Sequence, residues 1–161
     1  FCGLVPSAAI AVLGAARPAN ASMTAPPAGP PAGLATDCLK PAAFAGLAAL
    51  PAEPVLTPVD LGAHVLAYTA MSVVGAPYHR NEDGLIDTYR AFNGPQEEAR
   101  AILARRGIAL VAVCRALPDM KTFPERDDAS LAALLMRGEA PAWLKRADEG
   151  GAAVEIWRVV S

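Results

Sequence analysis

Charged residues are scarce in this sequence, and the basic ones do not gather in one stretch. Asp, Glu, Lys and Arg make up 19% of the 161 residues, and the formal net charge is −2. The chain therefore has no basic stripe for a phosphate backbone and no polybasic tail for anionic lipid, and nucleic acid is not expected as a partner. The apolar fraction of 53% argues against disorder and favours a protein that spends part of its length in or beside a membrane.

Motifs for metals, nucleotides and catalysis are also missing. The three cysteines form no C-x-x-C pair and have no metal-ligand spacing, so zinc is not indicated. The sequence contains neither G-x-G-x-x-G nor G-x-x-x-x-G-K-[ST], which argues against a nucleotide and against a cytosolic Rossmann-like enzyme. No Ser/His/Asp order or paired-carboxylate spacing stands out, so a self-contained enzyme is not supported and no cofactor is expected within this chain.

The cysteines leave a choice open. If the domain lies outside the cytoplasm, Cys38 and Cys114 can pair in a disulfide that closes a loop of about 76 residues and leaves Cys2 near the membrane. In the alternative interpretation, Cys38 and Cys114 are two buried thiols that act as small apolar side chains. The redox state of the compartment decides between them.

The first 35 residues differ in composition from the rest. Residues 1–16 carry no charged side chain but are shorter than the roughly 20 residues needed to cross a hydrocarbon core. We interpret them as the end of a transmembrane or apolar anchor segment that continues upstream; a signal peptide and a loosely docked N-terminus are the alternatives. Residues 17–35 are rich in Pro, Ala and Gly, which predicts an extended linker, and residues 36–161 are expected to form the folded domain.

Helix and strand patterns alternate along residues 36–161. Segment 95–107 has acids in its first turn, basic residues in its last and Gly107 as a stop, and segment 108–113 has no polar residue, as expected of a central strand. The pattern predicts an α/β domain, a small Rossmann-like sandwich with a mainly parallel sheet and helices on its faces. The predicted helices cover residues 36–50, 61–71, 84–92, 95–107 and 127–138, and the predicted strands cover residues 55–60, 72–77, 108–113 and 152–160. The pattern of residues 61–71 favours a short helix but also tolerates a strand.

Polar residues are expected to meet at the carboxyl edge of this sheet, where ligands bind in parallel α/β folds. Asp60 ends the first predicted strand, and Tyr78, His79, Arg80 and Asn81 follow the second. His79 can act as a general acid or base, Arg80 can clamp a phosphate or carboxylate, and Asn81 can bond a sugar hydroxyl. In the alternative interpretation Asp60 caps a helix, Asn81 or a neighbouring acid caps the next, and His79 with Arg80 is an exposed loop.

Within about residues 54–114, Asp60-Leu61-Gly62 follows a predicted strand, an Asn-bearing turn follows Pro77, and Gly94-Pro95-Gln96-Glu97-Glu98-Ala99 opens a helix before the strand IALVAV. This order resembles the soluble C-terminal domain of GT-C-type membrane glycosyltransferases. The catalytic subunit of oligosaccharyltransferases has a similar succession, although this chain has Pro58-Val59-Asp60 where that family carries Trp-Trp-Asp. The phrase APYHRN, residues 76–81, is similar to one in uncharacterised multi-spanning bacterial proteins.

This resemblance implies a polytopic protein of the bacterial inner membrane that uses a polyprenyl-phosphate-linked sugar donor, with this domain on the periplasmic side. The catalytic acid is then expected in loops between transmembrane helices, so the chain alone should be inactive. The resemblance also allows a divalent metal in the parent enzyme. Residues 1–16 would make the membrane contact, and the five polar residues at the sheet edge would help to hold the donor. A stand-alone periplasmic module that binds a ligand or a protein is the alternative.

Overall fold

The computed structural model describes residues 37–122, 128–149 and 152–160. The predicted anchor of residues 1–16 and the predicted linker of residues 17–35 lie outside these ranges. Within them, no helix combines the length and the apolar character that crossing a membrane requires.

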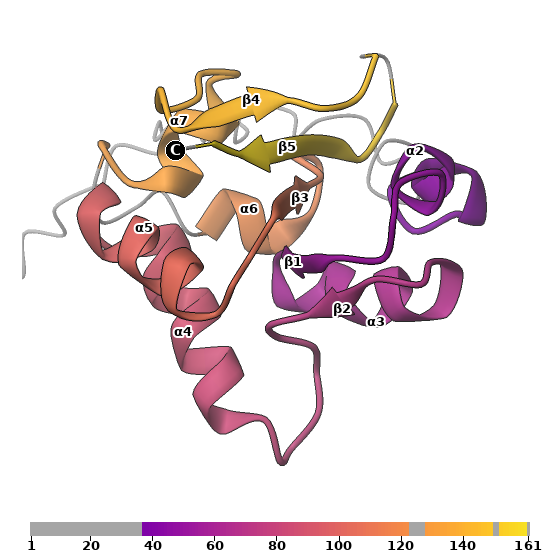
Figure 1. The fold of residues 1–161 in the computed structure, drawn as a ribbon, viewed down its shortest axis with the longest axis horizontal. Helices are drawn as coiled ribbons and strands as arrows, with labels where there is room; N and C mark the ends of the chain where they lie inside the picture. The colour runs from indigo at the N-terminus through magenta and orange to yellow at the C-terminus, as the bar shows by residue number, and fades with distance from the viewer. Residues whose placement is uncertain (1–36, 123–127, 150–151, 161) are drawn as a thin grey trace, which may run out of the picture.

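Five strands form one mixed sheet in the order β2-β1-β3-β5-β4 (Figure 1). Strand β1 pairs in parallel with β2 and β3, whereas β5 runs antiparallel to both β3 and β4. The α/β class is confirmed, but a mainly parallel sheet is not, because β4 and β5 are joined by a connection too short for a crossover helix. The strands are β1 (Pro54–Leu56), β2 (Ser72–Val73), β3 (Leu110–Val113), β4 (Leu144–Arg146) and β5 (Glu155–Val159).

Helices fill the connections between the strands. Helix α5 follows its predicted pattern, with Glu97 and Glu98 in the first turn, Arg105 in the last, and a following Gly107 whose φ of +63° suits a helix stop. The helical segments are η1 (Pro41–Phe44), α2 (Ala45–Ala48), α3 (Val59–Tyr68), α4 (Glu82–Asn93), α5 (Gln96–Arg105), α6 (Pro118–Thr122) and α7 (Leu131–Met136).

The sheet is covered on both faces, and β3 shows how. Val111 and Val113 pack in an apolar cluster with residues of α4, α5 and α7, whereas Leu110 and Ala112 pack in a second cluster with η1, α2 and α3. All four side chains are buried, as the two-residue period of a strand between two layers requires. Figure 1 shows α4 and α5 to one side of the strands and α2 to the other. The prediction of a central strand in segment 108–113 is therefore confirmed.

The segment around Asp60 differs from the sequence prediction. Strand β1 ends at Leu56, and Asp60 lies in the first turn of α3 instead of at the end of a strand. Pro58 explains the change, because it has no backbone N–H to donate to a sheet and its φ of −52° suits the residue before a helix. The one-turn helix α6 has no counterpart in the sequence prediction, since a single turn offers too little periodicity to detect.

Candidate functional site

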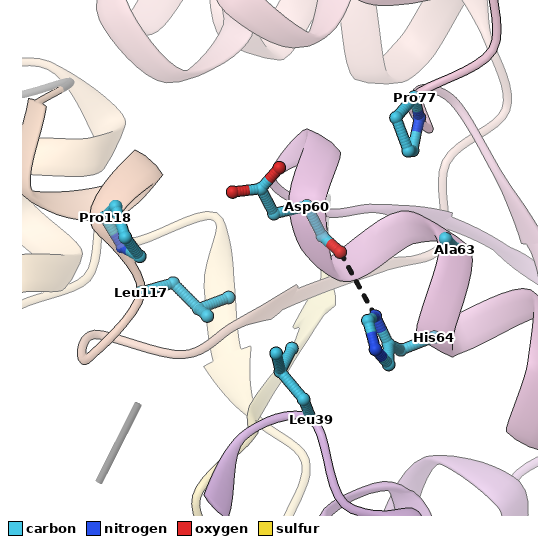
Figure 2. A pocket seen from close by; sticks show the side chains of 7 residues that line it. All are labelled: Leu39, Asp60, Ala63, His64, Pro77, Leu117 and Pro118. Atoms are coloured by element: carbon cyan, nitrogen blue, oxygen red, sulfur yellow. Dashed lines mark hydrogen bonds between the residues drawn. The ribbon is translucent and has the colours of Figure 1, made fainter. Parts of the chain in front are cut away.

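A pocket of about 460 Å³ opens at the carboxyl edge of the parallel strands. Its wall combines α3, the connection after β2, the connection after β3, and the segment that precedes η1. Ligands in α/β folds meet the sheet at this edge, which makes the pocket the leading candidate site. It is lined by Leu39, Asp60, Ala63, His64, Pro77, Leu117 and Pro118 (Figure 2).

Two carboxyl groups from different segments meet beside this pocket. Asp60 lies in the first turn of α3, and Asp119 lies in the first turn of α6. The backbone N–H of Asp60 donates to Oδ2 of Asp119 over 3.1 Å. Asp119 thus satisfies one of the N–H groups that the start of α3 leaves without a partner inside the helix.

The environment of Asp119 favours its protonated form. Burial raises the pKa of Asp119 above its ordinary value; the backbone N–H of Asp60 acts against this, while the charge of Asp60 and a hydrogen bond between the two side chains add to it. A nearby carboxylate disfavours the charged form of Asp119, so this group releases its proton at a higher pH than an ordinary aspartate does. A carboxyl group with a raised pKa is suited to donate a proton to a ligand.

The imidazole of His64 forms another part of the wall. Its Nδ1 lies 3.3 Å from the carbonyl oxygen of Asp60, one turn earlier in α3, and its ring stacks on Phe44 with centroids 6.4 Å apart. Figure 2 shows the carboxylate of Asp60 pointing away from His64, so these two side chains do not form an acid–base pair. The pocket therefore offers a ligand a mostly apolar surface with the carboxyl group of Asp60 and the imidazole of His64 at separate points.

Four of the five predicted site residues, all except Asp60, lie outside this pocket. Tyr78, His79 and Arg80 are exposed on the connection between β2 and α4 and do not line it, although the preceding Pro77 does. The structure thus brings Asp60 and Pro77, the start of this connection, together in the pocket wall. The polar residues that follow Pro77 do not join them there. A role for Asp60, Tyr78, His79, Arg80 and Asn81 in holding a substrate stays a prediction.

Asn81 has a structural contact that the sequence did not show. It stands at the N-cap position of α4, but its side chain makes no capping hydrogen bond. Instead, Nδ2 of Asn81 donates to the carbonyl oxygen of Val74 over 2.8 Å. This bond ties the start of α4 back to the segment that leaves β2, and it fixes both ends of the exposed connection.

A disulfide joins Cys38 to Cys114, with Cα atoms 6.1 Å apart. Both cysteines are buried. Cys38 precedes the pocket residue Leu39, and Cys114 follows β3 in the connection that carries Leu117, so the bond holds two parts of the pocket wall together. The same cysteines also line a neighbouring hollow of about 540 Å³.

Metal ligation has no support at this site. The described ranges contain no group of three or more His, Cys, Asp or Glu side chains that could hold a metal ion. Asp60 and Asp119 alone provide fewer oxygen ligands than Ca²⁺ prefers. A divalent metal in a parent enzyme stays a prediction about residues beyond this chain.

Sequence reasoning did not select Asp119 or His64 as site residues. Asp119 directly follows Pro118 shortly after the strand, and a Pro–acid pair is a helix-start signal that could have placed it at the carboxyl edge. His64 stood within an apolar helical stripe, so nothing in its spacing separated it from the core-facing residues.

The fold and this edge define a small α/β domain with a five-stranded mixed sheet. No protein-family model and no curated protein matches the chain. Among solved structures, the chain is similar to the C-terminal globular domain of an oligosaccharyltransferase from Archaeoglobus fulgidus, with a TM-score of 0.53 and 16% identity. The similarity covers 77% of this chain and 95% of that one. The expected oligosaccharyltransferase-like C-terminal domain is thus supported at the level of the fold, without support for the bacterial branch or the APYHRN phrase.

The carboxyl pair gives a pH dependence that can be measured. Because the pKa of Asp119 is higher in the folded protein than in the unfolded chain, the folded state holds this proton more tightly. Its contribution to stability is therefore present below the unfolded pKa and is lost as the pH rises through the raised folded pKa. Asp119→Asn keeps an oxygen acceptor for the Asp60 N–H but carries no charge, so this variant should gain stability relative to the wild type as the pH rises.

Urea denaturation at acidic and neutral pH tests this expectation. Asp128→Asn, which removes another carboxylate from a residue outside the pocket, is the charge-matched control. A stability difference between Asp119→Asn and the wild type that stays constant with pH would show that folding does not raise the pKa of Asp119.

Proposed function

We propose that this chain is the extracytoplasmic C-terminal domain of a polytopic bacterial membrane protein that transfers a sugar from a polyprenyl-phosphate carrier. The fold likeness carries the proposal, because it spans nearly all of the oligosaccharyltransferase domain and most of this chain. The disulfide adds support, since such bonds persist in oxidising compartments. In this proposal the catalytic acid, and any divalent metal, belong to parts of the protein outside this chain.

The carboxyl edge of the sheet would face the membrane-embedded active site. Arg80 is exposed there and makes no side-chain hydrogen bond or ion pair with any residue that the structure describes. Its planar guanidinium suits the oxygens of a carrier phosphate. Asp60, with Tyr78 and His79 on the same edge, would then contact the sugar.

Arg80→Ala should lower transfer by the full-length gene product about tenfold or more, the loss expected when a charged group loses its hydrogen bonds. The isolated domain should keep its stability, because an exposed arginine contributes little to the core. Transfer is measured in membranes as release of labelled sugar from a polyprenyl-phosphate sugar. Arg100→Ala, an exposed arginine on α5, is the matched control. Equal transfer by the two variants would make the connection after β2 a structural turn.

The location is tested separately from the chemistry. A reporter enzyme that is active only after export should be active in intact cells when it is fused to the full-length gene product directly after Val160 of this chain. If this fusion is inactive, and a reporter enzyme that works only in the cytoplasm is active at the same position, the proposal is contradicted, whatever the effect of Arg80→Ala.

A periplasmic binding module is the second candidate, and the pocket beside Asp60 is the observation that favours it. This pocket combines a mostly apolar wall with two polar side chains, Asp60 and His64, the general character of a small-molecule site. The two candidates differ in what precedes the domain: the module predicts a signal peptide upstream in the full-length gene product, and the transferase domain predicts several hydrophobic spans.

A further inference from the structure

Two hollows that share residues lie along α4, apart from the pocket beside Asp60. The apolar hollow, about 400 Å³, is almost free of polar surface and is lined by Val59, Leu85, Ile86, Tyr89 and Arg90. The arginine hollow, also about 400 Å³, is mainly polar and is lined by Asp83, Ile86, Asp87, Arg90, Arg105 and Arg106. Because Ile86 and Arg90 belong to both, the two hollows form one continuous surface with an apolar part and a cationic part.

Ion pairs account for part of the arginine hollow. Nη2 of Arg105 donates to Oδ2 of Asp87 over 2.7 Å, and Nε of Arg106 donates to the same oxygen over 2.5 Å. Burial alone would raise the pKa of Asp87, but the hydrogen bonds and charges of the two arginines outweigh it and hold that pKa below its ordinary value. Asp87 is thus ionised at neutral pH, and this network ties α4 to the end of α5.

Arg90 takes no part in this network of ion pairs. Its side chain makes no hydrogen bond or ion pair with any residue in the described ranges. Three arginines share the hollow with two aspartates, so the lining keeps a surplus positive charge. Nη2 of Arg106 also donates to the carbonyl oxygen of Asp83 over 3.1 Å. An anion placed there would meet Arg90 together with the remaining guanidinium N–H groups of Arg105 and Arg106.

The apolar hollow places large side chains at the surface beside this charge. Ile86 is 42% exposed and Tyr89 is 43% exposed, next to each other on the helix face that carries Arg90. Tyrosine and arginine suit the boundary between apolar and aqueous phases, because each has an apolar body and a polar end. The sequence showed no basic patch, because these arginines come from two helices and meet only when α4 packs on α5.

We propose that this face of α4 binds the surface of a membrane that contains anionic phospholipid. Arg90, with Arg105 and Arg106, binds the headgroup phosphates, and Ile86 and Tyr89 enter the apolar boundary below them. The charge surplus beside an apolar hollow matches a lipid, which presents a phosphate directly above its acyl chains. The inference agrees with the proposed function in placing the domain beside a membrane, but it does not need transferase activity.

Vesicle flotation of the full 161-residue chain tests this inference, with vesicles of phosphatidylcholine alone or mixed with phosphatidylglycerol. Binding should be tighter to the mixed vesicles, and Arg90→Ala should reduce that preference about fivefold, as expected for one basic residue at an anionic surface. Ile86→Ser should weaken binding by a similar factor. Arg100→Ala, an exposed arginine of α5 that lines a different hollow, is the matched control and should change nothing.

The comparison of the two vesicle types separates binding by the arginine hollow from binding by residues 1–16. Residues 1–16 carry no charged side chain, so they should not distinguish the two lipid compositions. Equal binding to both vesicle types, or equal effects of Arg90→Ala and Arg100→Ala, would overturn the inference. If inorganic phosphate shifts the amide signals of α4 while the chain shows no preference for phosphatidylglycerol, the hollow is a soluble-anion site and the lipid proposal fails. If the reporter fusion shows export while the chain shows no preference for phosphatidylglycerol, the proposed function stands and only the membrane contact of α4 is lost.

Discussion

Replacing both Cys38 and Cys114 by alanine should lower the free energy of unfolding by about 4 kcal/mol, the loop-entropy value for a disulfide that spans 76 residues. A loss of this size is a large part of the stability of an ordinary domain. Alanine is chosen because both positions are buried, so that a serine hydroxyl would add the separate cost of an unpaired polar group. The measurement is urea denaturation of the variant and the wild type under non-reducing conditions.

Reduction of the wild-type protein gives an independent test of the same bond. A reducing agent should move the wild-type denaturation midpoint toward that of the double variant and should leave the variant unchanged. Cys2→Ser is the control, since it removes a thiol without touching the disulfide. Finding both thiols free by mass spectrometry of the exported protein would contradict the pairing.

The parts of the fold that sequence could predict are those specified by neighbours along the chain. Helix α5 carries its own start, charge pattern and stop within a few turns, and β3 is an uninterrupted apolar run. Both therefore appear where the sequence placed them. The mixed sheet was not predictable in the same way, because the direction of β5 depends on its pairing with β4, a three-residue strand that has no clear pattern of its own.

The sites depend on residues that are distant in sequence, which is why the sequence identified them only in part. Asp60 and Asp119 are 59 positions apart, and no motif predicts that α3 and α6 meet. Arg90 likewise meets Arg105 and Arg106 only through helix packing. The general rule for the carboxyl edge pointed to Asp60, which lines the pocket from α3, but it could not separate Pro77, which also lines the pocket, from the exposed residues that follow it.

The segment that leaves β2 is held between two helices at glycine positions. A Cβ added to Gly62 of α3 would overlap the carbonyl oxygen of Gly75, and a Cβ added to Gly84 of α4 would overlap the carbonyl oxygen of Val74. Both obstacles are backbone atoms, which cannot move aside as the end of a flexible side chain can. The two glycines therefore let α3 and α4 approach this segment closely, and they fix where the exposed connection with Arg80 begins.

Gly62→Ala and Gly84→Ala should each lower the free energy of unfolding by about 3 kcal/mol, the upper part of the usual cost of overpacking. Helix propensity alone predicts the opposite sign, because alanine is better than glycine inside a helix by about 1 kcal/mol. Gly46→Ala is the matched control: it lies in α2, and its added Cβ would meet only Cδ1 of Ile156, at 3.3 Å. Urea denaturation of the three variants decides the matter. Close packing against the segment after β2 is excluded if Gly62→Ala and Gly84→Ala prove as stable as Gly46→Ala.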